Sequence, residues 1–195
     1  AGQSTGYAMD VAVTGENAYV ACGYLGLKII NVHSPVMPPV VGNVATVSDP
    51  RALAVEGDYV YLADGRYGVK IIDTSDPNSM RVVGQAPIGQ ALCVAAEEGI
   101  SYSTSFRGTF HVVDARNPST PKSAKLLLSE SYEFPYVTIV GEYVYTSDYD
   151  GNLDIIDVSN LSAPRFAVSP LQMRFSDLAV EGDYAYAARN GLEIC

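Results

Sequence analysis

Oxygen-bearing side chains alternate along one short stretch of the chain, and this stretch is the first candidate for a chemical site. Its sequence is Asp148-Tyr-Asp150-Gly-Asn152-Leu-Asp154. Hard cations such as Ca²⁺ are bound by oxygens at alternate positions, so the run resembles the opening of a calcium loop. The glycine that bends the usual loop is missing, however, and no bidentate glutamate follows at the required spacing. We therefore expect neither a metal nor another cofactor.

Side chains that commonly act as catalysts are few. The two histidines are His33 and His111. His111 lies at a position that is polar in every related segment of the chain, which is typical of a partly exposed strand residue. The serine-rich run 101–105 lacks a nucleophile elbow, and the sequence contains neither a glycine-rich phosphate loop nor a cluster of metal ligands. We therefore expect that the protein is not an enzyme.

The elements that would position such residues are defined most clearly between residues 51 and 83. This segment contains four short runs of alternating, β-branched or aromatic residues, which are typical of β-strands. Turn-forming Gly, Asp, Ser and Pro separate the runs. The sequence therefore predicts four short antiparallel strands, at 52–55, 59–63, 69–72 and 80–83.

The same unit recurs along the whole chain. Its second-strand tyrosines are spaced by 42, 41, 43 and 41 residues, at Tyr19, Tyr61, Tyr102, Tyr145 and Tyr186. A glycine stands four residues before each tyrosine except in the third copy, where Glu98 takes its place and Gly99 follows. Four strands in a period of roughly 40 to 50 residues are typical of propeller blades. We predict an all-β protein, a β-propeller of four-stranded antiparallel blades.

The repeat divides the chain into four full units and most of a fifth. We expect a single β-propeller domain over residues 1–195, with units at about 8–49, 50–90, 91–133, 134–175 and 176–195, the last of them incomplete. A propeller avoids an exposed sheet edge by closing its ring. Two arrangements therefore stay open: a small five-bladed ring with a weakly closed last blade, or a piece of a larger propeller.

The third strand of the unit and the turn after it carry a resemblance to a known family. The sequences Gly-Val-Lys-Ile-Ile-Asp-Thr-Ser-Asp-Pro (68–77) and Gly-Asn-Leu-Asp-Ile-Ile-Asp-Val-Ser-Asn (151–160) each follow a Gly-x-Tyr-Val-Tyr turn and strand. They resemble the LVIVP repeat of bacterial and archaeal surface proteins, over essentially the whole chain. The resemblance implies a β-propeller, commonly exported or attached to the cell surface, without a general catalytic motif. We therefore expect an extracellular or cell-surface location.

One rim of the propeller is the predicted binding face. In a propeller the loops between second and third strands share a rim with the loops that enter each first strand. Aromatic rings can stack on sugars or other planar groups, and arginine can bind a carboxylate. The alternative is that these are ordinary solvated loop residues. We predict that a protein, peptide or glycan binds at the rim through Tyr24, Arg66, Tyr67, Phe106, Arg107, Tyr149, Arg174 and Arg189.

A pair of carboxylates at the mouth of the central channel supports the leading alternative, a carbohydrate-active enzyme. Asp10 and Asp177 occupy equivalent positions in the first and fifth units. These units would be neighbours in a closed five-membered ring, and carboxyl groups about 5 to 10 Å apart can catalyse glycoside hydrolysis. The simpler interpretation is that both carboxylates solvate the channel mouth.

The net charge of the chain excludes some kinds of binding partner. Asp and Glu number 22 and Lys and Arg number 12, which gives a net charge of −10. This balance repels nucleic-acid phosphates and anionic lipids, so neither is an expected partner. No apolar run is long enough for a transmembrane segment. The sequence therefore favours a non-enzymatic binding or surface-interaction module, and a purely structural component of a surface layer remains a further alternative.

Overall fold

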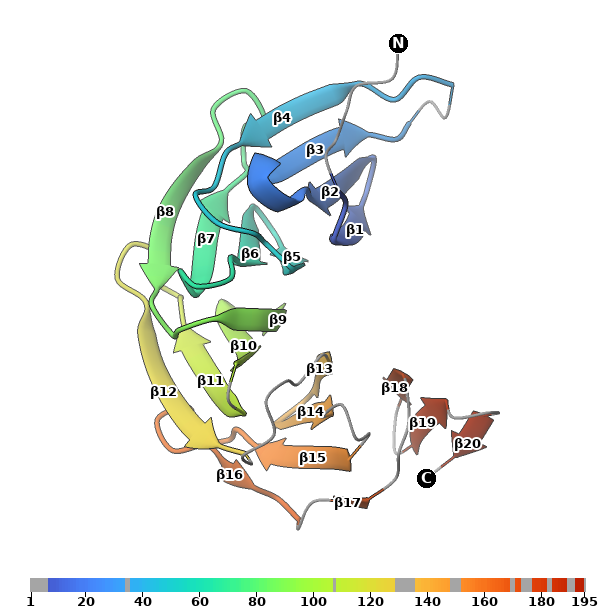
Figure 1. The fold of residues 1–195 in the computed structure, drawn as a ribbon, viewed down its shortest axis with the longest axis vertical. Helices are drawn as coiled ribbons and strands as arrows, with labels where there is room; N and C mark the ends of the chain where they lie inside the picture. Colours follow the sequence, from blue (N-terminus) through green and yellow to red (C-terminus); the bar gives the residue numbers. More distant parts are fainter. Residues whose placement is uncertain are drawn as a thin grey trace.

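The fold is a series of five antiparallel β-sheets that stand side by side round an arc (Figure 1). The computed structural model describes residues 7–33, 36–106, 108–128, 136–147, 152–168, 171–172, 177–181, 184–188 and 192–194. Within this part of the chain, each sheet contains strands from one predicted unit. The predicted all-β architecture of antiparallel, four-stranded units is confirmed.

The strand bounds follow the repeat. The first sheet contains β1 (Asp10–Thr14), β2 (Asn17–Ala21), β3 (Leu27–Asn31) and β4 (Val40–Val44), with the 3-10 helix η1 (Gly23–Leu25) between β2 and β3. The second contains β5 (Ala52–Glu56), β6 (Tyr59–Ala63), β7 (Val69–Asp73) and β8 (Arg81–Ala86). The third contains β9 (Ala91–Glu97), β10 (Ile100–Ser105), β11 (Thr109–Asp114) and β12 (Lys122–Leu127).

The remaining two sheets are built in the same way. The fourth contains β13 (Tyr136–Val140), β14 (Tyr143–Ser147), β15 (Asn152–Asp157), β16 (Arg165–Phe166) and β17 (Leu171–Gln172), the last two both pairing with β15. The fifth contains β18 (Asp177–Glu181), β19 (Tyr184–Ala188) and β20 (Leu192–Ile194). None of the helices in the described ranges is long and apolar enough to cross a bilayer.

The first strand of each sheet lies on the inner side of the arc. In Figure 1 these strands follow one another as β1, β5, β9, β13 and β18, and each contacts the next. Hydrogen bonds also link such strands directly. The Leu53 amide donates to Oδ2 of Asp10 over 2.8 Å, and the Tyr136 hydroxyl donates to the Leu178 carbonyl. Asp10 and Tyr136 open the first strands of their sheets, so the same position joins one sheet to the next in both places.

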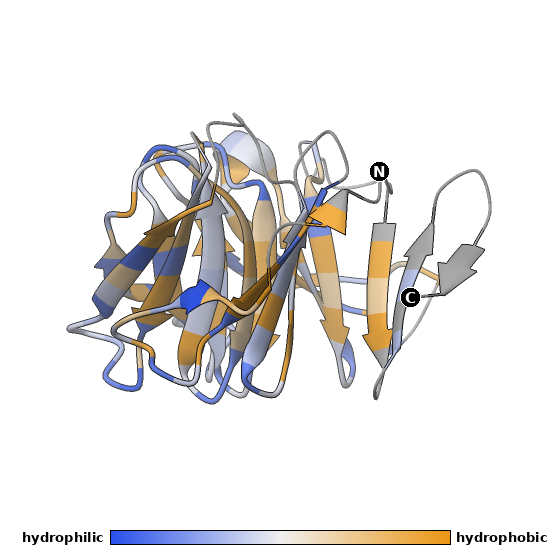
Figure 2. Cartoon of the chain, turned by 90° about the horizontal axis from the view of Figure 1, so that it is seen from below, coloured by the Kyte–Doolittle hydropathy of each residue, from blue (hydrophilic) through white to orange (hydrophobic). Residues whose placement is uncertain are grey.

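The hydrophobic core lies between the sheets. Successive side chains of a strand point to opposite faces, so each sheet packs one set against the sheet before it and the other against the sheet after it. In β6, for example, Val60 and Leu62 pack with the first sheet, whereas Tyr61 and Ala63 pack with the third. All four are almost completely buried. Most buried side chains of the middle strands are therefore hydrophobic, and many hydrophilic residues lie in the loops (Figure 2).

In the second and third sheets, the loop after the third strand docks on the outer strand of the preceding sheet. Pro77 lies against Gly42 of β4, and the carbonyl group of Pro118 lies against Gly84 of β8. Gly42 and Gly84 share one register position, opposite Ile29 and Ile71. The predicted end of the fourth strand before Gly84 is therefore wrong. The strand β8 continues through Gly84 to Ala86, because the glycine admits the docking loop without ending the ladder.

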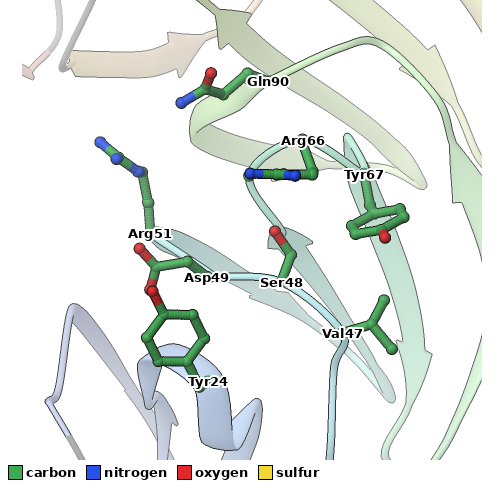
Figure 3. A pocket seen from close by; sticks show the side chains of 9 residues that line it. Tyr24, Val47, Ser48, Asp49, Arg51, Arg66, Tyr67 and Gln90 are labelled. Atoms are coloured by element: carbon green, nitrogen blue, oxygen red, sulfur yellow. The ribbon is translucent and has the colours of Figure 1, made fainter.

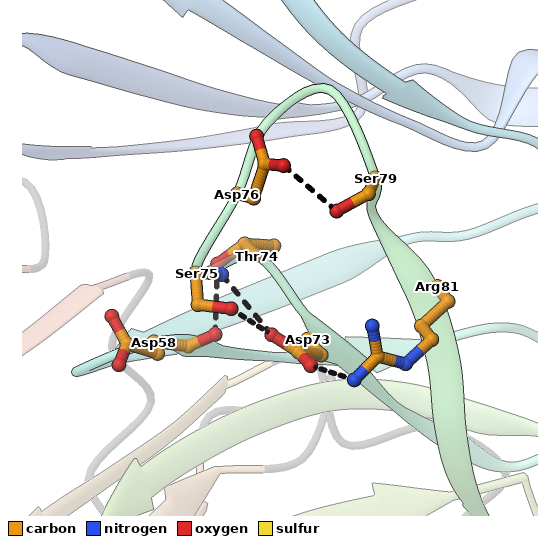
Figure 4. Close-up of polar contacts among 7 residues, drawn as sticks. All are labelled: Asp58, Asp73, Thr74, Ser75, Asp76, Ser79 and Arg81. Atoms are coloured by element: carbon orange, nitrogen blue, oxygen red, sulfur yellow. Dashed lines mark hydrogen bonds and ion pairs between the residues drawn. The ribbon is translucent and has the colours of Figure 1, made fainter.

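An aspartate at the end of the third strand closes the turn that follows it with hydrogen bonds, in the second and fourth sheets alike. Asp73 accepts from the backbone amide and the hydroxyl of Ser75 and forms an ion pair with Arg81 (Figure 4). Asp157 makes the same contacts with Ser159 and Arg165. The hydrogen bonds from Ser159 and Arg165 lower the pKa of Asp157 to about 2. The turn therefore stabilises the ionised carboxylate.

The hairpin turn between first and second strands changes type in the third sheet. In the first, second and fourth sheets the two-residue turn begins with Gly15, Gly57 or Gly141. Of the two turn residues only this glycine has a positive φ, which is typical of type II′. In the third sheet Glu98 has φ +53° and Gly99 has φ +74°, which is typical of type I′. The Gly99 amide also donates to the carboxylate of Glu56 in the second sheet. The shifted glycine of the third unit therefore changes the turn without breaking the hairpin.

Candidate functional site

A cavity opens at the rim between the first and second sheets. Its volume is about 270 Å³. The residues that line it come from η1, from the loop that enters β5, from the β6–β7 loop and from the end of the loop that enters β9: Tyr24, Val47, Ser48, Asp49, Arg51, Gly65, Arg66, Tyr67 and Gln90. We call this cavity the rim pocket.

Two backbone contacts hold the loops of the rim pocket together. The Ala91 amide donates to the Gly65 carbonyl over 2.9 Å, and the Arg51 amide donates to the Ala63 carbonyl over the same distance. Gly65 has φ +51°, and a Cβ there would lie 2.9 Å from the hydroxyl of Ser48. Glycine is therefore required at this position, both for its backbone conformation and for the close approach of Ser48.

The polar ends of three lining side chains point into the same space. In Figure 3, Arg51 and Arg66 face this space from two sides and the amide of Gln90 closes it from a third. The rings of Tyr24 and Tyr67 stand at its margins, Tyr24 beside Asp49 and Tyr67 beside Val47. Tyr24 is 82% exposed and Tyr67 is 39% exposed. The rim pocket therefore offers two cationic groups and two accessible aromatic rings.

Three of the eight predicted rim residues meet at this pocket. Tyr24, Arg66 and Tyr67 all line it. Phe106 lies next to it: its amide donates to the carbonyl of Gln90 over 2.8 Å. The other four, Arg107, Tyr149, Arg174 and Arg189, lie outside the described residues.

Arg51, Asp49 and Gln90 are lining residues that the sequence analysis did not select. All three belong to loops that lead into first strands, and Arg51 directly precedes β5. These loops share the rim with the loops between second and third strands. The sequence could have identified the three residues, because the loops that contain them were predicted to lie on the binding rim.

A buried ion pair supports the floor of the β6–β7 loop. Asp64 is 0% exposed and Lys70 is 6% exposed, and their side chains form an ion pair. The Lys70 ammonium also lies 5.5 Å from the ring centroid of Tyr67. Among the described residues, Oδ1 of Asp64 has no hydrogen-bond partner. In the part of the chain that the structure describes, Lys70 is therefore the group that compensates the charge on Asp64, and the ring of Tyr67 covers Lys70.

In the third sheet, Ser105 and His111 occupy the positions of Asp64 and Lys70, and they also interact. There the hydroxyl of Ser105 lies 3.2 Å from Nε2 of His111. His111 pairs with Ser103 in the sheet as Lys70 pairs with Leu62, so the two polar pairs are structurally equivalent. The prediction that His111 is partly exposed is wrong. It is 7% exposed, because the neighbouring sheets cover both faces of its strand.

Burial of His111 predicts acid sensitivity. Desolvation, helped by the charge of Lys125, lowers the pKa of His111 from 6.5 to about 4. Between these values the unfolded chain binds a proton that the folded chain does not, so stability is complete above pH 6.5 and decreases as the pH decreases toward 4. We expect the free energy of unfolding to decrease by up to about 1.4 kcal/mol per pH unit in this window. Urea unfolding at several pH values measures it.

The variant His111→Gln should lose this dependence between pH 6.5 and pH 4. His33→Gln is the matched control: it removes an exposed histidine and keeps His111, so the dependence that His111 causes should persist. An unchanged slope in His111→Gln would contradict the assignment. The carboxylates with lowered pKa values, Asp157 among them, are present in all the variants, so their contribution cancels when the slopes are compared.

The other sequence candidates do not form a site in the described structure. Both carboxylate oxygens of Asp10 accept backbone hydrogen bonds, from the amides of Val11 and Leu53. Asp10 is therefore a link between sheets, and the side chain of Asp177 lies outside the described residues. The calcium-like stretch lies outside them from 148 to 151, and Asp154, at its far end, is buried.

Solved structures of propellers share this fold. The computationally designed protein Ika8 matches with a TM-score of 0.74 and 13% identity, over 94% of this chain and 56% of that one. The β-propeller domain of Myceliophteria thermophila Cps50 (Swd1) matches with a TM-score of 0.71 and 12% identity, over 92% of this chain and 64% of that one. The designed protein Ika4 matches with a TM-score of 0.63 and 12% identity, over 77% and 90%. At this identity the likeness shows the β-propeller fold alone.

Sequence comparison identifies the repeat itself. No curated protein sequence matches the chain. The family model of the LVIVD repeat matches residues 5–46, 49–86, 136–170 and 175–195, which together make up most of the chain and leave out the third unit. The resemblance inferred from the sequence is confirmed, and the repeat is named LVIVD rather than LVIVP. Asp73 and Asp157, which close the turns described above, follow the Ile-Ile pairs of their units. The chain is a β-propeller repeat protein that belongs to the LVIVD repeat family.

Proposed function

We propose that this protein is a non-enzymatic binding or surface-interaction module, and that its ligand occupies the rim pocket. One observation carries the proposal. Tyr24, Arg66 and Tyr67, which the repeat pattern alone assigned to a binding rim, line one cavity together with Arg51. Aromatic rings beside guanidinium groups can stack on planar or sugar groups and bind carboxylates.

The proposed partner is a protein, peptide or glycan at the cell surface or outside the cell. The net charge of −10 argues against nucleic acid and anionic lipid. The extracellular or cell-surface location rests on the resemblance of the repeats to those of exported surface proteins. Export would bring the rim pocket into contact with glycans and with the surfaces of other proteins.

Replacement of Tyr24 tests the proposal. A thermal-shift screen with glycans and peptides would first identify a ligand, since a ligand at a hundredfold excess over its Kd stabilises the folded state by about 2.7 kcal/mol. Tyr24→Ala should then weaken binding of that ligand by about tenfold or more, because an exposed ring contributes contact area to the ligand and little to the core. Its melting temperature should change little.

The matched control is Tyr143→Ala. Tyr143 is an exposed tyrosine at the start of β14, on the opposite rim, so affinity should be unchanged. Tyr67→Ala is a poorer test, because Tyr67 also covers Lys70. Equal affinities in the two variants would place the ligand elsewhere. Release of a cleavage product from a glycan would favour the carbohydrate-active enzyme, and the absence of any hit would favour a structural component.

A further inference from the structure

Two arginines at the rim pocket form no ion pair with any residue that the structure describes. The ion pairs described in the structure use Arg81, Arg116, Arg165, Lys70 and His33. Among the described residues, neither Arg51 nor Arg66 lies in an ion pair, although both line the pocket with Asp49. In a chain of net charge −10, two unpaired guanidinium groups that face one space form a local cationic site. Such a site is complementary to an anion, and a guanidinium binds a carboxylate through two hydrogen bonds.

The rest of the lining selects a hydroxylated ligand. Val47 is the one aliphatic side chain among the nine lining residues. Ser48, Asp49 and Gln90 supply donors and acceptors around the two arginines. Peptide-binding sites commonly anchor apolar side chains in apolar pockets, and the rim pocket lacks such a surface. A sugar ring needs many hydrogen bonds at its edge and an aromatic ring against its apolar face. The rings of Tyr24 and Tyr67 line the rim pocket and can supply that aromatic contact.

We propose that the rim pocket binds an acidic sugar, a uronic acid residue of a glycan, with its carboxylate between Arg51 and Arg66. The ring hydroxyls hydrogen-bond with Ser48, Asp49 and Gln90, and a tyrosine ring stacks on the sugar. This inference rests on the proposed binding function and adds the class of ligand. It also adds Arg51 to the residues that determine specificity.

Calorimetric titration with two trisaccharides tests the inference. The first is a linear trimer of β-1,4-linked glucuronic acid, and the second is the same trimer after reduction of its carboxyl groups, which leaves glucose units. We expect the acidic trimer to bind about tenfold or more tightly than the neutral one, because only the acid forms charge-assisted hydrogen bonds with the two arginines. Arg51→Gln and Arg66→Gln should each weaken binding of the acidic trimer by about tenfold and leave the neutral trimer unchanged.

The control variant is Arg116→Gln. Arg116 is exposed and lies in the turn after β11, on the opposite rim, so its loss should not change the affinity for either trimer. The melting temperature of each variant shows whether it is folded. Because Arg51 and Arg66 are both exposed, we expect values close to that of the unchanged protein.

Four results would overturn the inference. Equal affinity for the two trimers would remove the role of the carboxylate. Tighter binding of triglutamate than of the acidic trimer, lost in Arg66→Gln, would assign the pocket to acidic peptides. A third result is that neither trimer binds, while the screen finds another ligand whose affinity decreases in Tyr24→Ala. That result would support the binding module and refute the acidic sugar as its ligand. If no glycan or peptide binds at all, the proposed function fails together with this inference.

Discussion

Replacement of Lys70 by methionine is expected to lower the free energy of unfolding by about 3 to 5 kcal/mol. The side chain of Asp64 is completely buried, and its Oδ1 already lacks a hydrogen-bond partner among the residues that the structure describes. Without Lys70, the carboxylate would remain buried with no compensating charge, and burial of an unpaired charge is among the most costly changes in a protein. Urea unfolding measures the loss as a lower midpoint at an unchanged slope.

Two further variants make this experiment specific. Lys122→Met removes an exposed lysine from β12 and should change stability by no more than about 0.5 kcal/mol. The double variant Asp64→Leu, Lys70→Met removes both charges and should recover most of the loss, because a buried ion pair can be replaced by apolar residues at little cost. A loss below about 1 kcal/mol in Lys70→Met would show that water compensates Asp64.

Replacement of Gly84 by alanine is expected to cost about 3 kcal/mol or more, at the upper end of the range for overpacked sites. A Cβ at this position would overlap the carbonyl oxygen of Pro118 and lie 2.9 Å from its carbonyl carbon. These are backbone atoms of the next sheet, so the contact can be relieved only if the two sheets separate. The measurement is again the midpoint of urea unfolding.

Gly42→Ala is the matched comparison. Gly42 occupies the same register position one sheet earlier, but the nearest atom to its Cβ would be the sulfur of Met80, at 2.5 Å. A flexible side chain can move, although the Pro77 carbonyl oxygen lies at 2.9 Å. We expect a smaller loss than in Gly84→Ala. Equal losses at the two positions would contradict the distinction between a movable side chain and a fixed backbone contact.

The period of the repeat made the fold predictable. Second strands spaced by about 42 residues and glycines at fixed offsets are local signals, and they identify the hairpins directly. The extension of β8 through Gly84 was not predictable in the same way. A glycine in a strand usually indicates a break, whereas here it makes room for the carbonyl of Pro118, which comes from the next unit. Contacts between two units cannot be recognised from the residue pattern of one unit.

The candidate site was predictable in part for the same reason. Loop position placed Tyr24, Arg66 and Tyr67 on one rim, and all three line the rim pocket. The burial of His111 was missed because a polar residue in an alternating strand suggests an exposed face. In this fold both faces of a middle strand are covered, so a polar residue there needs a partner inside the protein, and Ser105 is that partner for His111.

The docking of each loop on the preceding sheet bears on how such a chain can lengthen by gene duplication. Gly42 and Pro77 contact each other but belong to different units, and the same is true of Gly84 and Pro118. A copied segment therefore preserves its junctions only if its length equals the repeat period, as in the 42 residues from Gly42 to Gly84 or the 41 from Pro77 to Pro118. Any starting point within the period serves equally well. Recombination that adds or removes whole periods can therefore take place at any point of the repeat and does not have to coincide with a boundary between sheets.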